Sequence, residues 1–151
     1  MKRAIFLDMD NTIAALYDVP NWLPKLRAND PSPYAEAEVM VNMSHLARLL
    51  HKVQTLGYEV GIISWLSKTS TPTYDEAVTA AKLAWLNQHL PSVTFNEIHI
   101  VAYGTPKSSF MKTSADILFD DEEKNREEWK GLAYAPSDIV PVLQSLSQAA
   151  A

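Results

Sequence analysis

The sequence predicts an α/β fold in three layers, with a mainly parallel sheet of about five strands between helices. Short apolar runs, which are typical of buried strands, alternate along the chain with stretches whose apolar residues recur every three or four positions. Such alternation is the pattern of a parallel sheet covered by helices on both faces. A chain of 151 residues suits a single domain and does not require a second one.

The first half of the chain is expected to contain two strands and one helix. The first strand is the apolar run 4–7, and an irregular, proline-containing stretch, 13–41, follows it. A helix is predicted from near Asn42, because four leucines and Val53 recur at three- and four-residue intervals as far as Gly57, where a helix commonly stops. The second strand, 59–64, follows at once.

The second half is expected to continue the alternation. A helix is predicted after a polar loop, where Thr73 and Glu76 have the spacing of a capping box, and Pro91 ends it. The remaining predicted elements are strands at 97–102, 116–119 and 132–134, a short helix opening at the acidic run 121–123, and a last helix at 139–149.

Two aspartates stand directly at the end of the first strand. Side chains of a strand share a face at every second residue, so Asp8 and Asp10 are expected to point the same way beyond the sheet. Two close carboxylates repel each other and need a cation or a shared proton. A hard, oxygen-preferring ion such as Mg²⁺ suits them. The alternative interpretation is an acidic turn capped by Thr12.

Four segments, taken in order, resemble the four signatures of the haloacid dehalogenase-like (HAD) phosphatases. They are the Asp-x-Asp-x-Thr run 8–12, the apolar strand 60–64 that ends in Ser64, the lysine Lys107, and the strand 116–121 that ends in paired acids. This resemblance implies a Rossmann-like fold and a Mg²⁺-dependent phosphatase. All of these residues lie at or just beyond the carboxyl ends of predicted strands, which meet at one edge of a parallel sheet.

The resemblance also implies a role for each aspartate of the first signature. Asp8 would attack phosphorus and form an aspartyl-phosphate. Asp10 would protonate the leaving alcohol and then activate water, and its backbone carbonyl would bind the metal.

The later signatures imply the groups that bind phosphate and metal. Ser64 and Lys107 would bind the phosphate, and Lys107 is favoured over Lys112, which is expected near the opposite edge of the sheet. Asp120 and Asp121 would complete the metal site. One would bind the ion directly, and the other would either bind it through water or orient the lysine. Asp120 is slightly favoured as the direct ligand.

Substrate specificity is expected to depend on the insert at 13–41, which is too short for a multi-helix cap and carries large side chains. Tyr17, Trp22 and Tyr34 either pin an irregular loop to the sheet or form a small lid, in which Tyr17 and Trp22 could stack on a nucleobase. The ending Ile117 to Asp121 resembles that of the 5′(3′)-deoxyribonucleotidases, whose larger helical cap is missing here. The best single prediction for the substrate is a nucleoside monophosphate.

Two other functions stay open. A nucleic-acid end phosphatase would have a similar site, but the net charge of −5 argues against nucleic acid as the partner, because proteins that bind nucleic acids usually carry a basic stripe. A phosphate-binding module without catalysis would be expected to lack at least one of Asp8, Asp10, Lys107 and the acid pair, and all are present.

The composition indicates the setting in which the chain works. It contains no cysteine, which fits a cytoplasmic location, and no run approaching the ~20 apolar residues that cross a bilayer. The expected protein is a single domain, 1–151, that acts on a small phosphate monoester as a monomer or homodimer and does not bind membranes.

Overall fold

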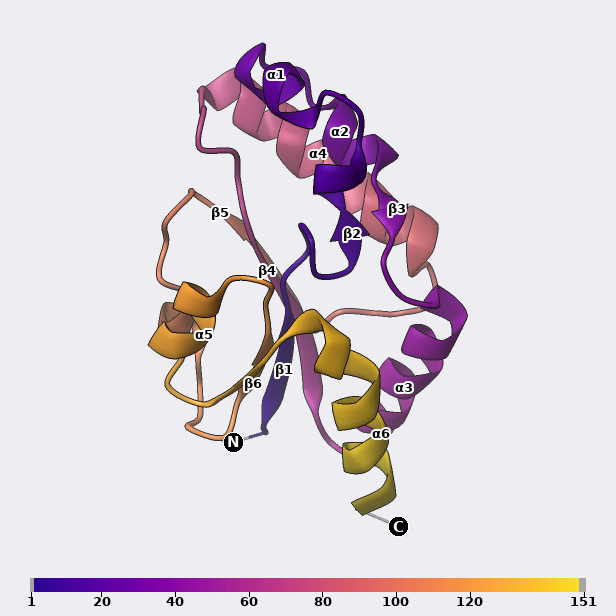
Figure 1. The fold of residues 1–151 in the computed structure, drawn as a ribbon. Helices are drawn as coiled ribbons and strands as arrows, with labels where there is room; N and C mark the ends of the chain where they lie inside the picture. The colour runs from indigo at the N-terminus through magenta and orange to yellow at the C-terminus, as the bar shows by residue number, and fades with distance from the viewer. Residues whose placement is uncertain (1, 150–151) are drawn as a thin grey trace.

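Five parallel strands form the central sheet of the computed structural model, which describes residues 2–149 (Figure 1). Their spatial order is β5-β4-β1-β6-β7, and each neighbouring pair is parallel. The strands are β1 (Ala4–Leu7), β4 (Glu59–Trp65), β5 (Glu97–Val101), β6 (Ile117–Phe119) and β7 (Leu132–Tyr134). The predicted α/β fold with about five parallel strands is therefore confirmed.

Two helices and the C-terminal part of a third cover one face of the sheet. The two are α3 (Met43–Thr55) and α6 (Ile139–Ala149), and the third is α4 (Pro72–His89). In β1, Ile5 and Leu7 point to this face and belong to a buried cluster with side chains such as Leu50, Trp85 and Leu143. Alternation along the strand places the intervening residues of β1 on the other face.

Short segments cover the other face. Phe6 and Leu118 pack there against Trp129, which follows α5 (Glu123–Glu128), and against Phe110 at the end of the 3₁₀ helix η2 (Lys107–Phe110). Another 3₁₀ helix, η3 (Pro136–Asp138), leads into α6.

The stretch 13–41 is not irregular, and this part of the sequence prediction is wrong. It contains short elements, namely β2 (Ala14–Ala15), η1 (Leu16–Asp18), α1 (Trp22–Arg27), α2 (Ser32–Glu36) and β3 (Glu38–Val39). β2 and β3 pair as a separate two-stranded antiparallel sheet. Elements this short show no apolar periodicity in the sequence, which is why the prediction missed them.

The insert packs against α4, above the carboxyl ends of the strands (Figure 1). Leu16, Leu26 and Tyr34 of the insert form a buried cluster with Tyr74 and Val78 of α4. The insert is thereby held beside the sheet edge at which the predicted site residues lie.

The N-terminus of α4 differs from the predicted capping box. The helix begins at Pro72, and Thr71 caps it, because the Thr71 hydroxyl accepts a hydrogen bond from the Tyr74 backbone N–H at 3.1 Å. Thr73 lies inside the first turn. Proline fits the first helical position, because the N–H that it lacks has no partner within the helix there. The pair Thr71-Pro72 was therefore a better sequence signal for the start of this helix than the pair Thr73 and Glu76.

Among residues 2–149, no helix is both long enough and apolar enough to span a bilayer.

Candidate active site

Asp8 follows β1 directly, and its carboxylate is buried and fixed by two donors. Thr12 donates its hydroxyl to Asp8 Oδ2 at 2.8 Å, and Lys107 Nζ donates to Asp8 Oδ1 at 2.9 Å. The Thr12 hydroxyl also accepts the backbone N–H of Asp121 at 3.1 Å, so it ties the first and fourth signatures together. Asn11 makes this turn possible with a φ of 61°, in the left-handed region that asparagine tolerates.

Lys107 lies between two buried carboxylates. It begins η2 after β5, and its ammonium contacts Asp8 Oδ1 at 2.9 Å and Asp120 Oδ2 at 2.6 Å. Burial disfavours its charge, but the charges of Asp8 and Asp120 outweigh that effect and hold the pKa of Lys107 above its usual range. Lys112 instead contacts Glu59 and Glu97, the first residues of β4 and β5, at the opposite edge of the sheet.

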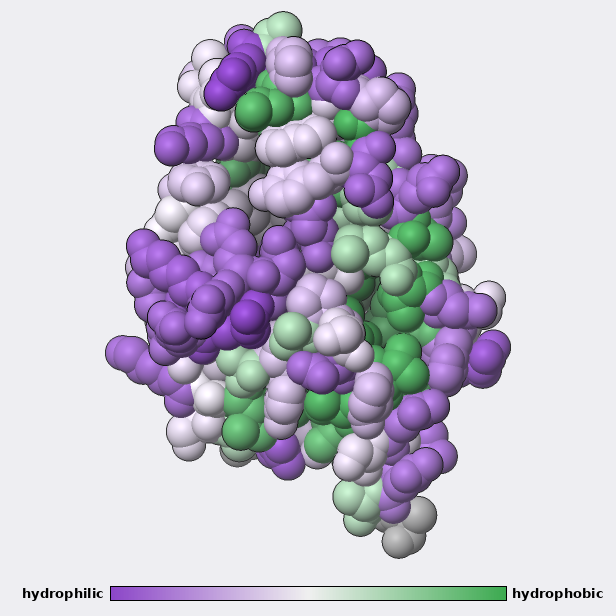
Figure 2. Space-filling view, in the orientation of Figure 1, coloured by the Kyte–Doolittle hydropathy of each residue, from purple (hydrophilic) through white to green (hydrophobic). Residues whose placement is uncertain are grey.

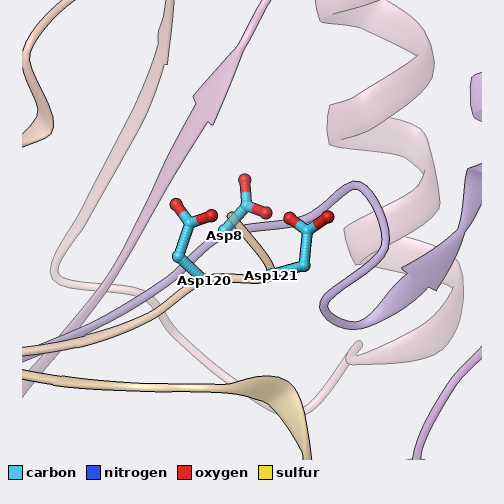
Figure 3. A group of neighbouring side chains, drawn as sticks. All are labelled: Asp8, Asp120 and Asp121. Atoms are coloured by element: carbon cyan, nitrogen blue, oxygen red, sulfur yellow. The ribbon is translucent and has the colours of Figure 1, made fainter. Parts of the chain in front are cut away.

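The two acids after β6 converge on Asp8. One carboxylate oxygen each of Asp8, Asp120 and Asp121 lies within 4.8 Å of the others, and Figure 3 shows the three side chains grouped around one point. Asp120 is additionally held by the backbone N–H of Glu122 at 2.9 Å and by the Asn125 amide at 3.2 Å.

Asp10 turns its carboxylate toward α4 rather than into this cluster. Its Oδ2 accepts a hydrogen bond from Lys82 Nζ at 2.9 Å, and the same ammonium donates to Ser64 Oγ at 2.6 Å. Burial raises the pKa of Asp10, Lys82 opposes this, and Asp8 adds to it. The sequence prediction missed Lys82, although a lysine four residues after Val78 stands on the apolar face of its helix, which was the available signal.

The charges of the site favour a bound divalent cation. Two lysine ammonium groups face four carboxyl groups, so the site carries two excess negative charges when all four are ionised. The charged groups are Asp8, Asp10, Asp120, Asp121, Lys82 and Lys107. Mg²⁺ prefers oxygen donors and is usually held by one or two carboxylates together with waters, so the converging carboxylates present fit that ion.

Without a cation, the acid pair holds its protons unusually tightly. Burial, the charge of Asp8 and a hydrogen bond to Asp8 raise the pKa of Asp121 to about 8. Burial and the charge of Asp8 raise the pKa of Asp120 to about 6, although Lys107 opposes the shift. A metal ion that binds the ionised carboxylates must therefore displace protons near neutral pH.

This shift predicts that the metal-free protein loses stability as the pH rises from about 4 to about 8. The folded protein binds more protons than the unfolded chain in that window, because the folded-state pKa values of Asp120 and Asp121 lie above the usual 3.8. Saturating Mg²⁺ should remove the loss. Thermal melts across this range with and without Mg²⁺ measure it, and Asp121→Asn is the control that should flatten the metal-free profile. A metal-free melting temperature that rises throughout the window, equally in Asp121→Asn, would contradict the prediction.

A cavity of about 610 Å³ opens above these carboxylates, a volume suited to a small-molecule ligand. Two aromatic pairs line it. Tyr17 and Trp22 of the insert stack with ring centroids 4.5 Å apart. Trp65, the last residue of β4, and Tyr103, which follows β5, are tilted with ring centroids 5.0 Å apart. Tyr17 and Trp22 were predicted as substrate contacts, whereas Trp65 and Tyr103 were missed because nothing in the sequence shows that they share the cavity.

The polar lining differs from the predicted one at one point. Ser64 is fully buried and does not line the cavity, and its hydroxyl oxygen accepts a hydrogen bond from Lys82. Ser67 lines the cavity instead. Arg27 and Lys68 add positive charge to the wall. Hydrophilic side chains gather over α5 beside it (Figure 2), where residues 121–128 include five acidic and two basic residues.

No protein-family model and no curated protein matches the sequence. Solved structures match it in fold. The D,D-heptose 1,7-bisphosphate phosphatase of B. bronchiseptica, complexed with magnesium and phosphate, has a TM-score of 0.62 and 11% identity over 97% of this chain and 99% of its own. A protein of Mesorhizobium loti assigned provisionally as a HAD-like phosphatase has a TM-score of 0.57 and 14% identity over 96% and 87%. The D,D-heptose 1,7-bisphosphate phosphatase of Burkholderia thailandensis has a TM-score of 0.52 and 14% identity over 83% and 70%.

At these identities the matches show the fold alone. The chain has the fold of the HAD-like phosphatases, as the four sequence signatures predicted.

Proposed function

We propose that the chain is a Mg²⁺-dependent phosphomonoesterase that hydrolyses a small phosphorylated metabolite through an aspartyl-phosphate. The observation that carries the proposal is the setting of Asp8. Its carboxylate is held by Lys107 and Thr12, beside the acid pair, where it lines a cavity of about 610 Å³. An oriented carboxylate next to a cation site is what nucleophilic attack on a phosphate ester requires.

The residues divide the reaction into two steps. Asp8 attacks phosphorus while Asp10 gives a proton to the leaving oxygen, and the bond from phosphorus to that oxygen breaks. Asp10 then takes a proton from the water that attacks phosphorus, and the bond to Asp8 breaks. Lys107 places positive charge beside the oxygens that carry negative charge in both steps. Bound Mg²⁺ would supply further charge neutralisation for the phosphate.

The contacts of the acid pair favour different roles for its members. Asp120 contacts Lys107 at 2.6 Å and accepts two further hydrogen bonds, which suits orientation of the lysine. Both acids line the cavity beside Asp8, but Asp121 is less buried than Asp120, which suits direct coordination of the metal. We therefore assign the metal to Asp8, Asp121 and the Asp10 carbonyl, with Asp120 adjacent. Ser64 is fully buried and does not line the cavity, whereas Ser67 does, so Ser67 is better placed to bind the phosphate.

The aromatic lining favours a substrate with a flat ring, and a nucleoside monophosphate is the substrate we propose. Tyr17 and Trp22 lie on the insert, Trp65 is the last residue of β4, and Tyr103 lies on the loop after β5. Aromatic side chains of this kind stack on bases without depending on base identity. Arg27 and Lys68 would add attraction for the anionic substrate.

A screen of phosphate monoesters in Mg²⁺ tests the proposed function. The panel needs nucleoside monophosphates, sugar phosphates, a small ringless ester and a 5′-phosphorylated oligonucleotide. Hydrolysis of a nucleoside monophosphate at a higher kcat/KM than the other esters is expected. Preference for the oligonucleotide would make the protein a nucleic-acid end phosphatase, and binding of phosphate without turnover of any ester would make it a binding module.

Replacing Tyr17 by Ala is expected to weaken binding of a nucleotide by ~1–3 kcal/mol, because base–aromatic stacking has that magnitude. Tyr17 is 54% exposed, so the free energy of unfolding should change little. The ringless ester is the control, and its KM should stay unchanged. Equal losses on both substrates together with a lower melting temperature would show that Tyr17 only anchors the insert.

A further inference from the structure

A buried lysine that the proposed reaction leaves unused contacts the proposed acid–base group. Lys82 of α4 is 1% exposed, and its ammonium donates to Asp10 Oδ2 at 2.9 Å, Ser64 Oγ at 2.6 Å and the Trp65 backbone oxygen at 2.7 Å. An ammonium group has three N–H donors, so these three bonds use all of them.

Lys82 cannot meet the substrate itself. It does not line the cavity, and the ring of Tyr34, which does, lies 4.9 Å from Lys82 Nζ. Asp10 in contrast lines the cavity, and its side chain is 23% exposed. Any effect of Lys82 on the reaction must therefore pass through another residue. Of its three hydrogen-bond acceptors, Asp10 is the one whose side chain both accepts the bond and lines the cavity, since Ser64 does not line it and Trp65 accepts through its backbone.

The other two contacts of Lys82 belong to the central sheet. Ser64 and Trp65 are the last residues of β4, which pairs directly with β1. The turn that carries Asp10 leaves β1 and runs into the insert. Lys82 therefore fixes the Asp10 side chain to the rigid sheet edge rather than to the turn alone.

We propose that Lys82 is a positioning residue that holds the Asp10 carboxylate at the cavity for proton transfer. The proposal rests on the proposed phosphomonoesterase function. Lys82 binds Asp10 Oδ2 and leaves Oδ1 to exchange the proton, first with the leaving oxygen and then with the attacking water. Small displacements of a proton-transfer group cost rate rather than binding.

A double-mutant cycle tests the proposal. Lys82→Met and Asp10→Asn are made singly and together, and kcat and KM are measured on an alkyl phosphate monoester in Mg²⁺. Lys82→Met is expected to lower kcat by about 100-fold, as a misplaced catalytic group does, with KM unchanged. In the Asp10→Asn background, Lys82→Met should cause no further loss, because the residue through which it acts is already inactive.

Leu86→Ala is the matched control on the same helix. Leu86 belongs to the buried core, so its truncation should lower the melting temperature while kcat per folded molecule stays unchanged in both backgrounds. A loss in kcat from Lys82→Met that is equal in both backgrounds, or an unchanged kcat in the wild-type background, would overturn the proposal.

A second variant and a crystal structure cover the case in which Lys82→Met does not fold or the wild type shows no turnover. If Lys82→Met does not fold, Lys82→Gln, which keeps a neutral donor, takes its place in the cycle with the same expectations. A crystal structure of the folded Lys82 variant should show the Asp10 carboxylate displaced from its wild-type position, and an unmoved carboxylate would overturn the proposal. Absence of turnover in the wild type would refute the proposed function, and the crystal structure would still decide the role of Lys82.

Discussion

Asp8→Asn is expected to lower kcat on the order of 10⁴-fold or more, as loss of a nucleophile does. The substitution keeps the size and shape of the side chain but removes the negative oxygen that attacks phosphorus. Its single amide oxygen can still accept a hydrogen bond from Lys107, whose contact at 2.9 Å holds the native carboxylate. Its NH2 group can donate to the Thr12 hydroxyl, which lies 2.8 Å from the other carboxylate oxygen. Folding should therefore survive, and the loss should appear in kcat rather than in KM. Steady-state assays at saturating Mg²⁺ measure it.

Asp18→Asn is the matched control for this variant. Asp18 is exposed on η1 of the insert and does not line the cavity, so this variant makes the same chemical change away from the site. It should keep wild-type turnover. Near-normal turnover of Asp8→Asn under saturating Mg²⁺ would replace covalent catalysis with direct attack by water.

Lys107→Met has the second largest expected effect, because it leaves two buried carboxylates facing each other. Breaking a buried ion pair by removing one partner costs ~3–5 kcal/mol of the free energy of unfolding. Mg²⁺ should restore part of that loss, since it supplies positive charge to Asp8 and Asp120. Loss of an electrostatic contact to the transition state should also lower kcat by ~10²–10³-fold. Denaturant unfolding with and without Mg²⁺, together with kinetics, measures both effects.

Lys112→Met controls for the loss of a lysine as such. Lys112 lies at the other edge of the sheet with Glu59 and Glu97, so its removal should leave kcat and KM unchanged. Loss of activity in Lys112→Met and not in Lys107→Met would reverse the assignment of the phosphate-binding lysine.

Local signals explain what the sequence could predict. The strands are short apolar runs, and the acids stand immediately after them, as Asp8 does after β1 and Asp120 after β6. Once the strands are parallel, their carboxyl ends must meet, so convergence of Asp8, Asp120 and Asp121 follows from chain order. The left-handed backbone of Asn11 could also be anticipated from residue type.

Long-range contacts explain what the sequence could not predict. Lys82 meets Asp10 across 72 positions, and Thr12 meets Asp121 across 109. Such pairs depend on how α4 and the strands pack. A single sequence does not show them, apart from the presence of a lysine on the apolar face of a predicted helix. The insert was misjudged for a different reason, since helices of five and six residues are stabilised by packing on α4 rather than by their own periodicity.

Trapping of the covalent intermediate tests the central claim most directly. The protein is mixed with a good phosphate-ester substrate and Mg²⁺, quenched in acid within the first turnovers, and examined by intact-protein mass spectrometry. The Asp10→Asn variant, in which release of the intermediate should be slow, increases the trapped fraction. We expect an added phosphoryl group that maps to the peptide containing Asp8 and is absent from Asp8→Asn. Turnover with no phosphorylated protein in either the wild type or Asp10→Asn, or with the phosphoryl group on another residue, would contradict the assignment of Asp8 as the nucleophile.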